Sequence, residues 1–254
     1  MSRGAPSIAE QWKEKHIMQK RANRSLLNER TMADVETIHR LSSSRFTCRA
    51  YLPDAVPASV IGSIVDIAKR SASWCNVQPW HVVVTSRETT DRFRAALVDH
   101  AARHTEIDSD IPFPAEYPGV YGERRREIGY ALYEALGIDR EDRVARARQA
   151  AENFRLFGAP HVAILTMPAE LGQYAAVDSG AFVASFLLAA RAYDVATTPQ
   201  AALANHAGFI RKYFGIGDER KFVCGIGFGY ADLAHPANGF RSTRAATKDV
   251  MRMV

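Results

Sequence analysis

Two segments that lie far apart in the sequence combine arginine with hydroxyl side chains. The first is Arg45-Phe46-Thr47-Cys48-Arg49, and the second is Asn238-Gly239-Phe240-Arg241-Ser242-Thr243-Arg244. Arginine offers a planar fork of donors and threonine adds a hydroxyl, so each segment has the chemistry to hold a phosphate. The ordinary alternatives are an exposed basic turn for the first segment and a solvated tail for the second. Neither segment alone decides between these interpretations.

Side-chain amides and small residues mark two further segments. Ser73-Trp74-Cys75-Asn76-Val77-Gln78-Pro79-Trp80 carries an asparagine and a glutamine, whose amides can read both donors and acceptors of a heterocycle edge. Thr198-Pro199-Gln200-Ala201-Ala202 contains small residues that would let a ligand approach the backbone. A loop with buried tryptophans and a plain helix–helix loop are the respective alternatives.

Metal and hydrolase chemistry have little support in the sequence. His100 and His104 are spaced like metal ligands on a helix, but no carboxylate partner or third ligand is evident, so we expect no metal site. The glycines of GIGFG at 225–229 lack the helix and acidic residue that follow a dinucleotide fingerprint. We interpret them as strand glycines that allow close packing. No GxSxG motif is present to indicate a serine hydrolase.

Composition indicates one globular domain without a membrane span. The chain has 254 residues, 47% hydrophobic and 24% charged, and no linker divides it. The longest apolar stretch, 180–190, falls well short of the roughly 20 residues that a span needs. The N-terminus shows no apolar signal region. Cys48, Cys75 and Cys224 are widely spaced and form no CxxC pair, which favours a reducing cytoplasm over disulfides or zinc.

The positive charge is concentrated near the N-terminus. The net charge is +5, and the first 50 residues contain ten Lys/Arg against five Asp/Glu. We expect residues 1–32 to form a basic extension, for which a solvated arm is the ordinary interpretation. Nucleic-acid binding through residues 1–50 is a remote alternative, and we expect none because no RNP, helix-turn-helix or zinc-finger signature is present.

Hydrophobic periodicity predicts a mixture of helices and strands, hence an α+β or α/β fold. Apolar residues at 33–41 lie near helical spacing. Loops are expected over 105–120, which carries several prolines, and over 197–202. We expect helices over 57–70, 90–104, 122–136, 139–156, 174–193 and 205–214, and strands over 82–85, 161–166 and 222–230.

The four segments, taken in order, resemble the nitroreductase family of FMN-dependent oxidoreductases. RFTCRAYLPDAVP at 45–57 resembles the family's opening Arg-x-Ser-x-Arg-x-Phe segment, and SASWCNVQPWHVVV at 71–84 resembles its Pro-Ser-x-x-Asn-x-Gln-Pro-Trp stretch. The stretch 178–200 fits its long central helix with the loop that follows, and 222–244 fits its closing strand and arginine tail. The resemblance covers about residues 33–250.

The resemblance implies an α+β fold with a central, mostly antiparallel sheet flanked by helices, in an intertwined homodimer. One FMN-binding domain would occupy 33–254, and each of two FMN sites would be built from both chains. The chain departs from the family pattern at Thr47, where serine is usual, and at Ala72, where proline is usual. Trp74 and Cys75 replace small residues, which bears on substrate choice more than on FMN binding.

Residue roles follow from position in the family motifs. The first arginine segment and the tail would bind the FMN phosphate and ribityl chain, with Arg49 near the flavin N1 and C2 carbonyl. The 73–78 segment would serve the pyrimidine edge and ribityl hydroxyls, and 199–201 would line one flavin face. The implied cofactor-binding residues are Arg45, Phe46, Thr47, Arg49, Ser73, Trp74, Asn76, Gln78, Pro199, Gln200, Ala201, Arg241 and Arg244.

The implied activity passes hydride from NADH or NADPH through flavin N5 to a nitroaromatic, a quinone or a similar electron-poor substrate, by a ping-pong mechanism. The flavin carries the chemistry, so no protein residue is assigned as strictly catalytic. Phe113, Tyr117 and Tyr121, within a lid at 105–130, could stack on an aromatic substrate or pack on their own domain. Reductive dehalogenation or another flavin-dependent redox reaction is the alternative, and a non-catalytic flavin-binding protein is a remote one.

Overall fold

The computed structural model describes Lys15, Met18 and residues 30–254, and these fall into two compact units. The described residues up to Ser44 belong to the first unit, in which 30–44 are helical. The helical spacing at 33–41 is therefore confirmed. Apart from Lys15, Met18 and 30–32, the expected basic extension over 1–32 lies outside the described residues. Arg45–Val254 form the second unit, which contains the sheet and the helices that cover it.

A four-stranded antiparallel sheet lies at the centre of the second unit. Its strands are β1 (His81–Val84), β2 (His161–Pro168), β3 (Ala196–Gln200) and β4 (Arg220–Gly229), in the spatial order β1-β2-β4-β3. All three neighbouring pairs are antiparallel. The expected α+β class with a central antiparallel sheet is confirmed.

The expected loop at 197–202 is wrong, because most of it is strand β3. Thr197 pairs with Phe228 and Gln200 pairs with Gly225, so the segment completes the sheet beside β4. Two β-branched threonines suit a strand. Pro199 argues against a strand when the sequence is considered alone. Proline is nevertheless tolerated at the edge of a sheet, where β3 lies. Ala201–Asn205 then form a short 3₁₀ helix.

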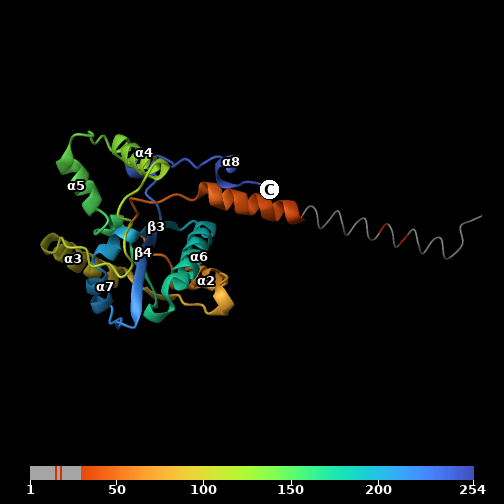
Figure 1. The fold of residues 1–254 in the computed structure, drawn as a ribbon, viewed down its shortest axis with the longest axis horizontal. Coiled ribbons are helices and arrows are strands. Elements are labelled where there is room, and N and C mark those ends of the chain that lie inside the picture. The colour runs from red at the N-terminus through yellow and green to blue at the C-terminus, as the bar shows by residue number, and fades with distance from the viewer. Residues whose placement is uncertain (1–14, 16–17, 19–29) are drawn as a thin grey trace, which may run out of the picture. The chain divides into compact units, whose positions relative to one another are not determined.

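Helices cover both faces of this sheet (Figure 1). One face carries α2 (Ala58–Ala68) and α6 (Gly172–Ala192), and the other carries α3 (Arg87–Arg103) and α7 (Ala207–Tyr213). Strand β2 alternates between the two cores: Ala163 and Leu165 face α6, whereas Val162 and Ile164 face α3 and α7. Because β2 is buried on both sides, its sequence is largely apolar, and residues 162–165 form an uninterrupted apolar run.

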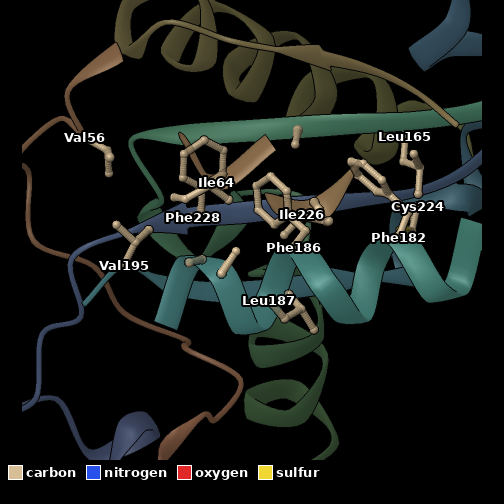
Figure 2. Packing of buried hydrophobic residues seen from close by; sticks show 14 residues of the cluster. Val56, Ile64, Leu165, Phe182, Phe186, Leu187, Val195, Cys224, Ile226 and Phe228 are labelled. Atoms are coloured by element: carbon tan, nitrogen blue, oxygen red, sulfur yellow. The ribbon is translucent and has the colours of Figure 1, made fainter. Parts of the chain in front are cut away.

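The central helix α6 packs its aromatic side chains on the sheet. Phe182 and Phe186 lie one turn apart and point toward β4, where Ile226 and Phe228 meet them (Figure 2). The segment 169–192 is long and apolar enough to cross a membrane by length and composition. Its packing against the sheet accounts for these apolar residues in a globular core.

The remaining helices differ in length from the predicted ones. α4 (Val120–Ala135) ends just before Gly137, whose positive φ of 65° closes the turn as predicted. α5 (Arg143–Ala151) is shorter than the expected 139–156, because Asp142 caps its start by accepting the N–H of Ala145. A short helix, α8 (Thr247–Val250), lies in the polar C-terminal tail.

Candidate functional site

The first arginine segment lies against the free edge of β3. Thr47 forms a parallel bridge with Thr197, and the Cys48 N–H donates to the Thr197 carbonyl at 3.0 Å. The Thr198 hydroxyl donates to the Cys48 carbonyl. These contacts satisfy the outer edge of the sheet and fix the direction of the chain from which Arg45 and Arg49 project.

Asn238 joins the same segment to the C-terminal tail. Its Oδ1 accepts the Arg49 N–H at 2.7 Å, and its Nδ2 donates to the carbonyls of Ala50 at 2.9 Å and Asp232 at 2.8 Å. Asn238 is 3% exposed, so these bonds lie in a water-poor environment. They bring the two arginine segments together.

Three arginines gather at this junction. The Arg241 guanidinium lies 4.0 Å from the centre of the Phe46 ring, a cation–π contact between the two segments. Burial, followed by repulsion from Arg244, lowers the pKa of Arg45. Among the ion pairs formed by the described residues, none involves Arg45, Arg241 or Arg244. This arginine cluster (Arg45, Arg241 and Arg244) is therefore a concentrated positive charge without a carboxylate counterpart in the described part of the chain.

Arg49 occupies a more buried position beside this cluster. Burial is the main cause of a lowered pKa for its guanidinium, which lies 5.7 Å from the Phe240 ring centre. It also lines a cavity of about 320 Å³, together with Arg148, Glu152 and His235. A half-buried cation at the wall of a cavity can stabilise negative charge on a bound group more strongly than a cation in water.

The 73–78 loop is held in an unusual backbone conformation. Cys75, Asn76 and Gln78 have φ of 48°, 57° and 51°, and they are half of the described non-glycine residues with positive φ. Such conformations cost of order 1 kcal/mol or more each, and they persist where surrounding contacts enforce them. Here the Ser73 hydroxyl accepts the Gln78 N–H at 3.0 Å.

Asp178 on α6 anchors the start of that loop. The backbone N–H of Trp74 donates to both of its carboxylate oxygens at 3.2 Å, and Asp178 is only 9% exposed. The Trp74 side chain itself is 57% exposed and meets Tyr174 edge-on at 4.5 Å. The loop therefore presents Trp74 and the amides of Asn76 and Gln78 at the surface.

One chain holds the arginine segment and the 73–78 loop at opposite ends of the sheet. The segment is bridged to Thr197, which pairs with Phe228 near the end of β4. The loop ends at Pro79, whose carbonyl accepts from Arg220 at the start of β4. Between Arg220 and Phe228 a strand advances about 25 Å. The two sets of predicted cofactor residues are thus not brought together within one chain.

The 199–201 group is placed partly inside the protein. Gln200 is 2% exposed and its Nε2 donates to the Asn153 carbonyl at 2.8 Å, while its Oε1 is buried without a hydrogen bond from the described residues. Pro199 is half-buried and Ala201 is exposed. Only the backbone of this edge and the Pro199 and Ala201 side chains can meet a ligand without rearrangement.

Two of the aromatic residues predicted for the substrate pocket, Phe113 and Tyr117, lie on an anchored loop, and the third, Tyr121, lies in the first turn of α4. Phe113, Tyr117 and Tyr121 are 38%, 45% and 61% exposed. Asp108 ties the loop to α7 by accepting the Gly208 N–H at 2.9 Å, and Asp110 ties it to β4 through the Phe222 N–H at 2.7 Å. These aromatic side chains are available at the surface of this chain.

Two positioning residues, Asn238 and Asp178, are absent from the predicted site. Asn238 stands inside the predicted tail segment, but its amide faces the protein rather than a ligand. Asp178 is a solitary acid in the apolar sequence of α6, and that isolation is the signal which could have marked it.

Comparison with known proteins identifies the family. The model of the nitroreductase family matches residues 43–230. The chain belongs to the nitroreductase family. Its members that resemble it include nitroreductase NfnB of Mycolicibacterium smegmatis, 36% identical over 220 residues, which are 85% of this chain and 92% of the relative. A 4-nitrobenzoate reductase of Pseudomonas putida is 33% identical over 202 residues, covering 80% of this chain and 88% of that protein.

Solved structures of nitroreductases share the fold. The crystal structure of the FMN-dependent NfnB from Mycobacterium smegmatis in complex with NADPH superimposes with a TM-score of 0.83, at 36% identity, over 87% of this chain and 99% of the other. An FMN- and NADPH-dependent nitroreductase from sphigopyxis sp. strain HMH gives a TM-score of 0.82 at 27% identity, over 85% and 98% of the two chains. The predicted nitroreductase-like fold is confirmed.

Proposed function

We propose that this protein is an FMN-dependent nitroreductase that uses NADPH or NADH to reduce nitroaromatic compounds. The observation that carries the proposal is the arginine cluster without a carboxylate counterpart, in a chain that belongs to the nitroreductase family. Relatives are named as FMN-dependent, as complexed with NADPH and as acting on 4-nitrobenzoate. Flavin-dependent dehalogenation, the alternative from the sequence, has no such relative among those described above.

The arginine cluster fits the phosphate of FMN. Arg45 and Arg244 repel each other, and a dianion between them would replace this repulsion by attraction. Arg241 is already oriented by the Phe46 ring and by the Asn238 carbonyl, which its Nη1 reaches at 2.7 Å. Phe46 and Thr47 would then border the ribityl chain. These residues bind and orient the cofactor.

Arg49 would lie at the flavin N1 and C2 carbonyl. FMN, when bound, supplies the redox chemistry by accepting a hydride from the nicotinamide and passing it to the nitro compound. Arg49 has the half-buried position in which a fixed cation stabilises negative charge that develops on the ring. Its backbone is fixed by Asn238, so the cation is positioned before the reaction begins. The proposal requires no protein nucleophile.

The separation of the two cofactor-binding sets supports a homodimer. Ser73, Asn76 and Gln78 lie at one end of the sheet and the arginine cluster at the other, about 25 Å away along β4. The ring edge and the phosphate of one FMN do not lie that far apart. We infer that one chain binds the FMN phosphate and places Arg49 at N1 and the C2 carbonyl, while Ser73, Asn76 and Gln78 of the other chain contact the rest of the pyrimidine edge. Trp74 and the exposed edge at Pro199 and Ala201 would lie beside the ring.

The substrate would enter under the exposed aromatic side chains of Phe113, Tyr117 and Tyr121. An aromatic lid can stack on a nitroaromatic ring, whose electron-poor face is complementary to tyrosine. The nicotinamide and the nitro compound would occupy the same position above the flavin. Because they must then bind in turn, the reaction would follow a ping-pong order. Three free cysteines fit an enzyme of the cytoplasm.

A visible absorption spectrum of the purified protein tests the proposal. We expect flavin bands that bleach on anaerobic addition of NADPH or NADH and return on addition of 4-nitrobenzoate. Arg45→Ala and Arg244→Ala should lower FMN affinity by about tenfold or more each, because each removes a charge-assisted contact. Arg252→Ala, in the exposed end of the tail, is the matched control and should leave FMN binding unchanged. A protein that remains colourless with added FMN would exclude the function.

A further inference from the structure

A pocket of about 530 Å³ lies between α4 and the C-terminal tail. Arg241, Ser242, Thr243 and Arg244 form one side, so the pocket adjoins the arginine cluster. Its volume is in the range of small-ligand sites in proteins. The proposed FMN site uses only one edge of it, which leaves the α4 side unassigned.

One face of α4 forms the opposite side of this pocket. Arg124, Glu127, Ile128 and Ala131 all line it, and their spacing of three, four and seven positions places them on one stripe of the helix. Arg124 is exposed and forms none of the ion pairs made by the described residues. The stripe therefore offers a cation at its N-terminal end and an apolar surface beyond it.

The charge of the pocket is predominantly positive. Three arginines, Arg124, Arg241 and Arg244, line it against one acid, Glu127. The Glu127 carboxylate accepts from the Thr243 hydroxyl at 3.3 Å and is not paired with any of these arginines. The FMN phosphate accounts for the arginines of the tail, but Arg124 is supplied from a different element. A second anion beside an apolar wall is the ligand that this arrangement fits.

We propose that this pocket binds the adenosine 2′-phosphate end of NADPH, with Arg124 contacting the 2′-phosphate, and that Arg124 makes the enzyme prefer NADPH to NADH. The proposal rests on the proposed function. Ile128 and Ala131 would support the adenine ring, while Arg124 pairs with the phosphate that NADH lacks. Glu127 opposes this preference, because its charge repels the same phosphate.

Binding to the FMN-loaded protein tests this assignment. The dissociation constants of NADP⁺ and NAD⁺ are measured by calorimetry for the wild type, Arg124→Ala and Glu127→Gln. We expect Arg124→Ala to weaken NADP⁺ binding by about tenfold and to leave NAD⁺ unchanged, because only one ligand carries the 2′-phosphate. Glu127→Gln keeps the oxygen that accepts from Thr243 and should strengthen NADP⁺ binding by a few-fold.

The control lies two positions along the same helix. Arg126 is exposed and does not line the pocket, so Arg126→Ala should leave both dissociation constants unchanged. Adenosine 2′,5′-bisphosphate should compete with NADP⁺ in the wild type and lose about tenfold in affinity in Arg124→Ala, whereas 5′-AMP should not distinguish the two proteins.

The outcomes separate this proposal from the proposed function. FMN content is measured for every variant, and we expect it to be unchanged by Arg124→Ala. Equal weakening of NADP⁺ and NAD⁺, or no change in either, would overturn the role of Arg124 while leaving the nitroreductase function intact. Loss of FMN from Arg124→Ala would also overturn it, because Arg124 would then belong to the flavin phosphate. A wild-type protein that binds no FMN would instead refute the proposed function itself.

Discussion

Asn238 fixes the backbone of Arg49 across 189 positions of sequence, its Oδ1 accepting the Arg49 N–H at 2.7 Å. The same amide donates to the carbonyls of Ala50 and Asp232. One buried side chain thus satisfies three backbone groups and sets the position of the cation proposed to lie at the flavin N1. The strength of that arrangement can be measured in the absence of any substrate.

Asn238→Ala should destabilise the protein and weaken FMN binding together. The change leaves three part-buried backbone groups without this partner, and we expect a loss of about 2–3 kcal/mol in the free energy of unfolding. Urea unfolding of the FMN-free protein and FMN titration measure the two effects. Asn238→Asp retains the acceptor for Arg49 but turns a buried carboxylate oxygen toward the two carbonyls that the amide had bonded, so it should destabilise the protein at least as much as Asn238→Ala. Unchanged stability in both variants would contradict the structural role.

Asp178→Ala should release the 73–78 loop. The Trp74 N–H loses its carboxylate partner, and positive φ at Cys75 and Asn76 is then less well enforced. We expect a loss of about 1–2 kcal/mol in the free energy of unfolding and weaker FMN binding. Asp66→Ala, at an exposed residue of α2, is the control and should cost less than about 1 kcal/mol. FMN affinity equal to that of the wild type would show that the loop does not touch the cofactor.

Acid should destabilise the protein through a histidine cluster beside α7. His100 lies 4.3 Å from His104 and 5.1 Å from His206 between ring centres. Burial is the main cause of lowered pKa values for His100 and His206, with repulsion among the rings adding to it and Asp108 opposing it. The unfolded chain therefore binds protons more readily than the folded one just below the ordinary value of 6.5, and the free energy of unfolding falls as the pH drops through that range.

His100→Phe tests this pH dependence. Phenylalanine keeps the stacking on Phe209, which lies 4.1 Å away, and cannot be protonated. We expect a flatter dependence of the free energy of unfolding on pH between about 5 and 7 than in the wild type. His39→Phe, at an exposed position of the 30–44 helix, should leave the profile unchanged. A wild-type profile retained in His100→Phe would rule out the cluster as its cause.

The helices and the inner strands could be predicted because their apolar spacing reflects burial. On α2, the apolar residues Ile64 and Ala68 lie on the face that is buried. In β2, the apolar run at 162–165 indicates a strand that is buried on both sides. Strand β3 could not be predicted from the sequence, because a short edge strand needs few apolar residues and Pro199 is typical of a turn. Pairing with β4 outweighs that local preference.

The residues proposed to contact the cofactor were easier to predict than the residues that hold them in position. Arg45 and Arg241 stand in motifs that the sequence displays directly, and the structure places them together through Phe46. Asp178 and Asn238 act through contacts 104 and 189 positions away, and no local pattern encodes such a pairing. The tertiary fold alone brings these residues to the backbone groups that they hold.

Alkylation of Cys75 can test where the 73–78 loop lies relative to FMN in the proposed dimer. Cys75 is exposed in the protomer, whereas Cys48 and Cys224 are buried and burial raises the pKa of Cys224 to about 12. Iodoacetamide should therefore add one label to the FMN-free protein, at Cys75, because thiolate character and access set the rate. FMN should slow the reaction by about tenfold or more if the loop contacts the cofactor across the dimer, as intact mass against time will show. Cys75→Ser should remove the label altogether, and equal rates with and without FMN would contradict the shared site.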